Sequence, residues 1–345
     1  MTIRTTAPSV IAAALLLAGL IVSVVLGTTA VPLGVAVEAL MGRGEPQTIA
    51  VVQQIRLPRA VCAALVGANL ALAGVMLQGV MRNPLAAPNI VGVTAGAGLG
   101  ATLTLVLAPI ALSPILPAAA FIGALAAALV VYTLALQPGS GTAPVRLVLA
   151  GVAVSAMLTA VTTFVMLLRP ERVPSVVMWL AGNLNTVGWR ETGMALPFTG
   201  EGFSAEPFRG VAWYTVVAIP VMLWLSRPLD LLQLGEERAR SLGVATERVR
   251  FVAITVAAWL AGAAVSVAGL VGFIGLIVPH AMRMVTGPRH AALLPAAALG
   301  GAALLVWADL AARVFPVGPM PVGIFTALLG GPYFIALLHS ARLVR

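Results

Sequence analysis

The sequence predicts an all-α, polytopic membrane protein with about ten transmembrane helices, organised as a single transmembrane domain over residues 1–345. Three observations support this fold class: the mean hydropathy is +1.05, hydrophobic residues make up 60% of the chain, and apolar runs of membrane-spanning length recur along it. A soluble domain buries its core with much less apolar sequence than this.

A helix that crosses a bilayer needs about 20 mostly apolar residues, and polar breaks bound the runs of that length. The candidate segments are residues 8–27, 59–80, 90–108, 115–136, 147–168, 176–197, 210–226, 251–268, 270–287, 291–312 and 321–340. The segment 176–197 is polar and contains glycine, so we expect a short or re-entrant helix there that does not cross. The remaining spans are even in number and place both termini on one side of the membrane.

The composition excludes several classes of protein. All twenty basic residues are arginine, so no enzyme that needs a P-loop lysine or a Schiff-base lysine is possible. The single cysteine, Cys62, rules out an internal disulfide and a cysteine-based metal site, and we expect no metal and no other cofactor in this chain. The arginines form no long basic run with interleaved aromatic residues, so nucleic acid is not an expected partner. No catalytic constellation is found, and we do not expect an enzyme.

The arginines favour an N-terminus on the inner side of the cytoplasmic membrane, because inner loops carry an excess of positive charge. Twelve arginines then lie inside and eight outside. The inner group is Arg4, Arg82, Arg146, Arg227, Arg238, Arg240, Arg248, Arg250, Arg283, Arg289, Arg342 and Arg345. The first segment could instead be a cleaved signal peptide, since small residues follow it at "LGTTA". We favour a retained helix, because about 19 apolar residues exceed a usual signal core.

Small residues within the second segment are spaced for close helix packing. Gly67, Ala68, Ala71 and Gly74 recur at three- and four-residue intervals and form one smooth stripe. Helices in lipid gain most from such stripes, because apolar side chains gain nothing by leaving the bilayer.

Polar residues and prolines interrupt the apolar pattern in two places. "QGVMRNPLAAPNIVGVTAGAG" contains Gln78, Asn83 and Pro84, and "GFIGLIVPHAMR" contains Pro279 and His280. Broken helices persist at membrane depth only where they are buried in protein or line a wet cavity, so these five residues are candidates for a translocation path. For His280 the alternative is a neutral packing residue beside a helix kink.

Asp309 lies in an otherwise apolar run, where an unpaired carboxylate is costly. Arg313 follows four residues later and can reach Asp309 on the same helix face. Either these two residues form a local ion pair, or Arg313 makes an outward contact.

The stretch "LDLLQLGEERARSLGVATERVR", residues 229–250, is dense in charge, unlike the rest of the chain. Its centre begins after Gly235 with two glutamates, continues with two arginines and ends at Gly243, as expected of a short helix matched to its own dipole. The alternative is a merely solvated loop helix.

Five motifs carry a family resemblance: "IRLPRAVCAALVGANLALAGVMLQGVMRNPLAAPNIVGVTAGAG", "LGEERARSLGV", "GLVGFIGLIVPHAMRMVTG", "ADLAAR" and "PVGIFTALLGGPYFIALL". From about Ile55 to Leu338 the chain resembles the permease subunits of ABC importers for ferric siderophores, haem and cobalamin, the FecCD-type, type II importers. The resemblance implies a dimer of ten-helix permeases, identical or related, with two cytoplasmic ATPase subunits that hold ATP and Mg²⁺. It also implies an extracytoplasmic binding protein that delivers a metal chelate.

The resemblance also implies roles for particular residues. The segment around "LGEERARSLG" would be a cytoplasmic coupling helix that seats in a groove of the ATPase, with Ala239 and Leu242 facing the partner. The residues assigned to it are Leu234, Gly235, Glu236, Ala239, Leu242 and Gly243. The resemblance further assigns Arg56, Arg59 and Arg313 to the outer face, where they would bind acidic residues of the binding protein. Interfacial snorkelling is the competing interpretation of these arginines.

Two segments depart from the family pattern. Residues 199–212, "TGEGFSAEPFRGVA", look like an insertion on the outer side, which either tunes docking or is a tolerated loop. The loop 137–146 is rich in glycine and proline, so a cytoplasmic constriction near it cannot be assigned to particular side chains.

These features together predict the transmembrane permease subunit of an importer, working by alternating access without chemistry in this chain. Ferric siderophore is the favoured cargo, with haem and cobalamin as alternatives. An ion-coupled secondary transporter would have to rely on Asp309 and His280, and a non-transporting scaffold would bind an ATPase without a substrate path.

Overall fold

The computed structural model describes residues 3–27, 29–108, 115–137, 141–194, 210–316, 318 and 320–342. Within these residues seven helices are long and apolar enough to cross a membrane. They are α1 (Ile3–Val25), α4 (Leu57–Met81), α6 (Leu116–Ala135), α7 (Pro144–Leu167), α10 (Val211–Leu232), α12 (Thr246–Ala268) and α14 (His290–Arg313). Three further apolar helices are α5 (Val93–Leu107), α13 (Ile274–Thr286) and α15 (Val322–Arg342). Every segment expected to span, 176–197 aside, contains one of these helices.

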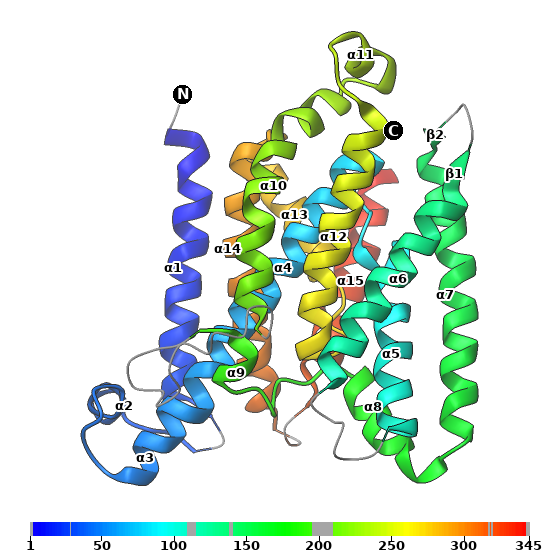
Figure 1. Ribbon diagram of the computed structural model, residues 1–345. Coiled ribbons are helices and arrows are strands. Elements are labelled where there is room, and N and C mark those ends of the chain that lie inside the picture. The colour runs from blue at the N-terminus through cyan, green and yellow to red at the C-terminus, as the bar shows by residue number, and fades with distance from the viewer. Residues whose placement is uncertain are drawn as a thin grey trace.

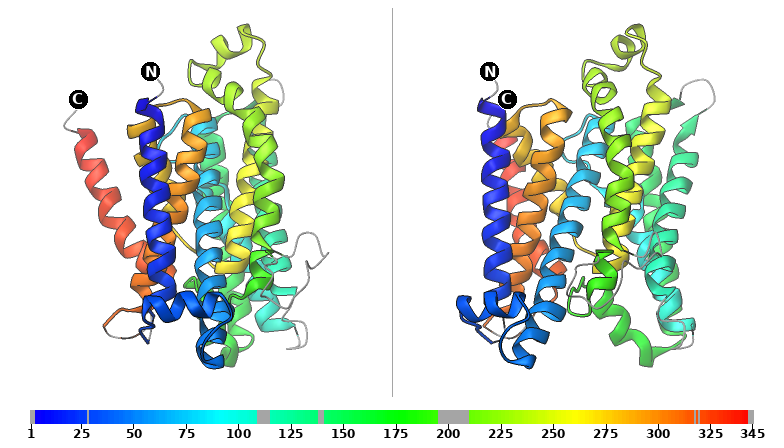
Figure 2. Two further views of the ribbon diagram at one scale, coloured as in Figure 1. Left: turned by 90° about the vertical axis from the view of Figure 1, so that its left-hand side faces the viewer. Right: turned by 60° about the vertical axis from the view of Figure 1, so that its left-hand side comes forward.

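The helices stand side by side, and short elements cover both ends of the bundle (Figure 1). One end carries α11 (Glu236–Ser241), the antiparallel strand pair β1 (Leu136–Gln137) and β2 (Gly141–Thr142), and both termini. Figure 2 shows the same separation of the two ends from other sides. The opposite end carries α2 (Leu33–Leu40), α3 (Pro46–Ala50), α8 (Val173–Leu180) and α9 (Trp189–Thr192). The remaining short helices are η1 (Val51–Arg56), η2 (Pro88–Val91) and η4 (Pro170–Arg172).

The segment expected not to cross the membrane contains only short helices. With eight residues, α8 extends about 12 Å at 1.5 Å per residue, far less than the roughly 30 Å of a bilayer core. The chain is non-helical from Gly182 until α9 begins. The insertion expected at residues 199–212 lies mostly outside the described residues, which resume at Gly210 just before α10.

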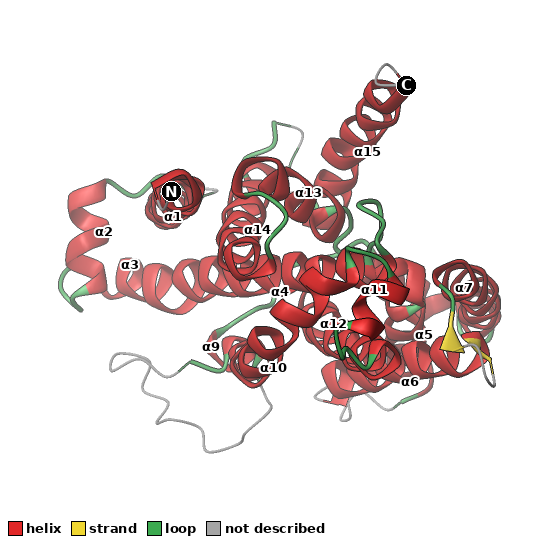
Figure 3. Ribbon diagram, turned by 90° about the horizontal axis from the view of Figure 1, so that it is seen from above, coloured by secondary structure: helices red, strands yellow, loops and turns green. Residues whose placement is uncertain are grey.

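The centre of the bundle is formed by α4 and α12, which are buried over most of their length. Viewed from above, α1, α7 and α15 lie at the periphery (Figure 3). Along α7 the exposed side chains are large and apolar, among them Leu149, Met157 and Phe164. Such a surface is stable only against lipid or another apolar surface.

Glycines allow the backbones of the central helices to approach very closely. A Cβ atom at Gly67 would lie 2.2 Å from the carbonyl oxygen of Gly301 in α14, and one at Gly74 would lie 1.9 Å from that of Gly275 in α13. Both glycines belong to the stripe predicted from the sequence, and its packing role is confirmed. The Gly275 carbonyl can face α4 this closely because Pro279, four residues later, has no N–H to donate to it.

We predict that Gly74→Ala destabilises the folded protein by about 1–3 kcal/mol, because the new methyl group overlaps the Gly275 carbonyl. Thermal unfolding in detergent, followed by size-exclusion chromatography, measures this loss. The matched control is Gly331→Ala in α15, where a Cβ atom meets nothing within 4 Å. Equal melting temperatures for the two variants would contradict the close packing.

Candidate functional site

At the end of the bundle that carries the termini, α11 projects between α10 and α12 (Figure 1). A glycine flanks this helix at each end, because the backbone turns there through a left-handed conformation: φ is +110° at Gly235 and +85° at Gly243. A Cβ atom at either position would meet nothing within 4 Å, so the backbone conformation, and not crowding, requires glycine. The short helix predicted from the sequence is therefore present with its predicted ends.

The side chains of α11 and its flanks divide into an outward and an inward set. Leu234 and Leu242 are 53% and 59% exposed, and both point away from the bundle as isolated apolar groups. Ala239 is 0% exposed and belongs to the main apolar core. The expectation that Ala239 faces a partner is wrong in this structure, because the inward side of a six-residue helix packs on its own bundle.

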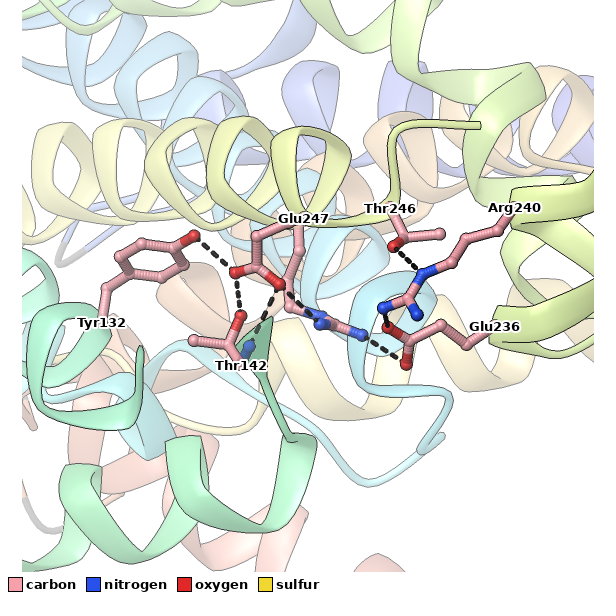
Figure 4. Close-up of polar contacts among 7 residues, drawn as sticks. Tyr132, Thr142, Glu236, Arg240, Thr246 and Glu247 are labelled. Atoms are coloured by element: carbon pink, nitrogen blue, oxygen red, sulfur yellow. Dashed lines mark hydrogen bonds and ion pairs between the residues drawn. The ribbon is translucent and has the colours of Figure 1, made fainter. Parts of the chain in front are cut away.

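Ion pairs hold α11 against α12. Glu236 accepts hydrogen bonds from Arg240 at 2.6 Å and from Arg250 at 3.2 Å (Figure 4). Arg240 also donates to the hydroxyl of Thr246 at 3.2 Å, the first residue of α12. Glu236, assigned from the resemblance to the coupling segment, therefore anchors the helix to its own chain.

Glu247 extends this network away from α11. One of its oxygens accepts hydrogen bonds from the hydroxyls of Tyr132, at 2.7 Å, and Thr142, and the other accepts from the backbone N–H of Thr142 at 3.0 Å (Figure 4). Arg250 donates to the second oxygen at 3.0 Å. The carboxylate thus joins α6, β2 and α12.

Sequence reasoning missed most of this network. The spacing of Glu247 and Arg250, three residues apart on one helix, was a usable signal for their ion pair. No local pattern could pair Glu247 with Tyr132 or Thr142, which lie 115 and 105 positions away.

A second unpredicted contact closes the same end of the bundle. Asp230 near the end of α10 accepts a hydrogen bond from the backbone N–H of His290, at 2.9 Å, and its oxygen lies 2.6 Å from His290 Nδ1. A carboxylate at this position satisfies an N–H of the first turn of α14 and favours the helix dipole. The buried histidine is therefore His290, whereas His280, the expected path residue, is only partly buried.

At the opposite end, two arginines bind one buried aspartate. Asp309, 1% exposed, lies 2.7 Å from Nη2 of Arg59, whose Nε also donates to both carboxylate oxygens at 3.1 and 3.0 Å. Nε of Arg313 lies 3.2 Å from the second oxygen, so the local ion pair considered from the sequence is present. Arg59 further donates to Asn185 at 2.5 Å, and Arg313 donates to Ser23 of α1.

The three arginines expected on the outer surface lie at this end but point inward. Arg56 is buried and donates to the backbone carbonyls of Val24 and Val25 at 2.8 and 2.9 Å, where α1 ends. Those carbonyls lack intrahelical partners, so the guanidinium caps α1. Arg313 is buried as well, and the side chain of Arg59 is 12% exposed. Of the three, Arg59 is the least buried in this structure, with 12% of its side chain exposed against 8% for Arg313.

The residues expected to line a path lie near one another without sharing a cavity. Gln78 is buried and donates to the carbonyl of Leu276 at 3.2 Å, one turn before Pro279. Asn83 accepts from the N–H of Leu85 at 2.9 Å, in a turn that exposes Pro84. A cavity of about 380 Å³ adjoins this region between α4, α5, α12, α13 and α15. Its lining includes Leu85, Asn89, Thr94, Leu276, Phe273 and Phe334.

Known proteins resemble this chain over most of its length. Residues 15–340 match the model of the FecCD transport family. The chain is 43% identical to the cobalamin import system permease protein BtuC of Halobacterium salinarum, over 89% of this chain and 79% of that protein. It is 41% identical to the Fe(3+) dicitrate transport system permease protein FecD of Escherichia coli, over 85% and 86% of the two chains. It is 40% identical to the hemin transport system permease protein HmuU of Yersinia pestis, over 84% and 83%.

A solved structure shares the whole architecture. An inward-facing metal-chelate type ABC transporter superposes with a TM-score of 0.79 at 29% identity, covering 96% of this chain and 98% of that one. The family match spans nearly the full length, and these relatives are permease proteins of import and transport systems. The chain therefore belongs to the FecCD transport family, the polytopic membrane permeases of ABC transporters.

Proposed function

We propose that this chain is the permease subunit of an importer for ferric siderophores in the cytoplasmic membrane, with ten transmembrane helices and α11 as its coupling helix. One observation carries the proposal: α11 lies at one end of the bundle between two left-handed glycines, tied to α12 by ion pairs, with two exposed leucines beside it. A short, rigid helix with apolar side chains at its surface suits a groove in another protein.

The cargo within the family is the open part of this proposal. Relatives of this chain include an achromobactin permease of Dickeya dadantii and a probable siderophore permease of Bacillus subtilis, at 40% and 36% identity. Cobalamin and hemin permeases are at least as similar, at 43% and 40% identity, so haem and cobalamin remain the alternatives. The cavity beside α13 has few polar groups in its lining, which suits a large, weakly polar chelate.

The mechanism that we propose is alternating access driven from outside this chain. Two cytoplasmic ATPase subunits would bind ATP and Mg²⁺ and pull on α11, and a second permease, identical or related, would complete the path. The exposed apolar surface of α7 fits contact with lipid or with that second permease. We assign to the path Gln78 of α4, Asn83 and Pro84 in the turn after it, and Pro279 and His280 of α13. None of them lines the cavity, but Leu276 and Leu85, which bond to Gln78 and Asn83, do.

The opposite end would receive the binding protein. Arg59 would make the direct contact, because its side chain is the least buried of the three and a guanidinium can bind a second carboxylate. Arg56 and Arg313 would act there by holding α1 and α14 in place around it.

The same contacts argue against an ion-coupled secondary transporter. Such a transporter needs a membrane carboxylate that gains and loses a proton or cation, and Asp309 was the candidate from the sequence. Two arginines neutralise Asp309 in this structure, so it is ill suited to exchange an ion.

ATP-dependent uptake into proteoliposomes tests the proposed function directly. We expect vesicles with this chain, its ATPase and its binding protein to accumulate ferric siderophore when ATP is enclosed, and to be insensitive to a protonophore. Haem and cobalamin are offered in parallel. Uptake without a second, different permease shows that two copies of this chain are enough to form the path. Uptake of only haem or only cobalamin would show that the cargo is that compound and not a ferric siderophore. Protonophore-sensitive uptake without ATP would contradict the proposal of an ATP-driven importer.

Changing Leu242 to aspartate tests the coupling helix. We expect Leu242→Asp to weaken ATPase binding roughly tenfold or more, because a carboxylate in an apolar groove loses its hydration. Co-purification in detergent, or titration with labelled ATPase, measures the affinity. Leu33→Asp is the control, since Leu33 is 57% exposed on α2 at the opposite end. Equal binding by both variants would place the ATPase elsewhere.

Arg59→Ala tests docking. We expect this variant to weaken binding-protein capture by permease in nanodiscs roughly tenfold, because it removes the least buried arginine of the cluster. Asp309 keeps Arg313 as a partner, so the fold survives. Arg169→Ala is the control, because Arg169 is exposed at the same end and bound only loosely, 3.7 Å from Glu171. Unchanged affinity for Arg59→Ala would rule out docking through this arginine.

A further inference from the structure

The strand pair β1–β2 is held to the rest of the molecule through a carboxylate of another helix. Both the N–H and the hydroxyl of Thr142 in β2 donate to Glu247 of α12. Tyr132 in the last turns of α6 donates to the same carboxylate at 2.7 Å. Two residues after Thr142, α7 begins at Pro144. The position of Glu247 therefore determines where the head of α7 lies.

Arg250 connects that carboxylate to α11. Its Nη1 lies 3.0 Å from Glu247, and its Nη2 lies 3.2 Å from Glu236, the first residue of α11. The side chain of Arg250 is 3% exposed, whereas those of Glu236 and Glu247 are 27% and 35% exposed. A planar guanidinium that binds two carboxylates through separate nitrogens keeps them at a fixed separation.

Together these contacts form one polar chain from Glu236 through Arg250 and Glu247 to Thr142 (Figure 4). It starts on the helix proposed to bind the ATPase and ends at the hairpin that leads into α7. The destination lies at the edge of the bundle, where much of the apolar surface of α7 is free of other described helices.

We propose that Arg250 and Glu247 are positioning residues that carry a displacement of α11 to the β1–β2 hairpin and the head of α7. The inference rests on the proposed function, in which the ATPase moves α11. Because Arg250 is buried and bonds to both carboxylates through short, charge-assisted contacts, a displacement of one carboxylate is passed to the other. A chain of contacts transmits a signal only if both ends change together, and that is measurable.

The test uses a cysteine at Val145, which is 69% exposed in the first turn of α7. Cys62→Ala removes the one native cysteine, which is buried. The complete complex with its ATPase is labelled with a water-soluble maleimide, with and without ATP. We expect the labelling rate at position 145 to change with nucleotide in the parent, and we expect Glu247→Gln to abolish most of this change.

Glu247→Gln removes the charge that binds Arg250 but keeps an oxygen that can accept from Thr142, so the hairpin stays attached. We expect the nucleotide-dependent ratio of labelling rates to approach one, and transport per ATP hydrolysed to fall roughly tenfold. Glu171→Gln is the matched control, since Glu171 pairs with an exposed arginine at the opposite end. If Glu247→Gln fails to fold, Arg250→Lys is the second variant, because one ammonium cannot serve both carboxylates in this geometry.

The outcomes separate the inference from the function on which it rests. If Glu247 only holds the hairpin in place, Glu247→Gln changes the labelling rate by the same factor with and without ATP. A ratio of the two rates equal to that of the parent therefore overturns the inference. A parent whose labelling does not respond to ATP overturns it as well. ATPase binding is measured in the same samples: it should survive Glu247→Gln and fail in Leu242→Asp. If Leu242→Asp binds normally, the proposed coupling helix is wrong, and the relay falls with it.

Discussion

Close backbone contact between α4 and its neighbours α13 and α14 is the constraint on which the other features depend. Gly67 and Gly74 let carbonyl oxygens of these helices lie where a side chain would otherwise stand. That separation decides which polar groups can meet, because α4 carries Arg59 near one end and Gln78 near the other. At a wider separation Arg59 would not reach Asp309 of α14, and Gln78 would not reach Leu276 of α13. Packing and polar contacts are therefore consequences of one helix geometry.

Charge is kept at the two ends of the bundle and is neutralised across helices. The ion pairs of Arg59 and Arg250 each cross from one helix to another, and both involve buried side chains. Isolated charges of this kind would be very costly next to lipid, so each pair also fixes the relative position of its helices. The two ends differ in what they leave exposed: one exposes leucines beside a helix, and the other exposes a small part of the Arg59 side chain.

Much of this fold follows from the sequence, because helices in lipid must be long, apolar and internally hydrogen-bonded. The positions of the spans, the short helix between Gly235 and Gly243 and the packing stripe on α4 were all readable from local patterns. Contacts distant in sequence were not, as between Arg59 and Asp309, 250 positions apart. The inward face of Ala239 was missed because six residues contain too few turns to define a buried side. The capping role of Arg56 depends on where α1 ends in space, which no motif specifies.

The loop that carries α11 is fastened at both of its ends. Asp230 holds the end of α10 to His290, and Glu236 is held to α12 by Arg250, so the thirteen residues 233–245 have few conformations open to them. Ordering a flexible loop consumes part of the free energy of any association. Here the contacts of Asp230 and Glu236 hold the loop in place within this chain. A partner that binds α11 meets a surface in its final shape, and nearly all of its contact energy is available to hold the complex together.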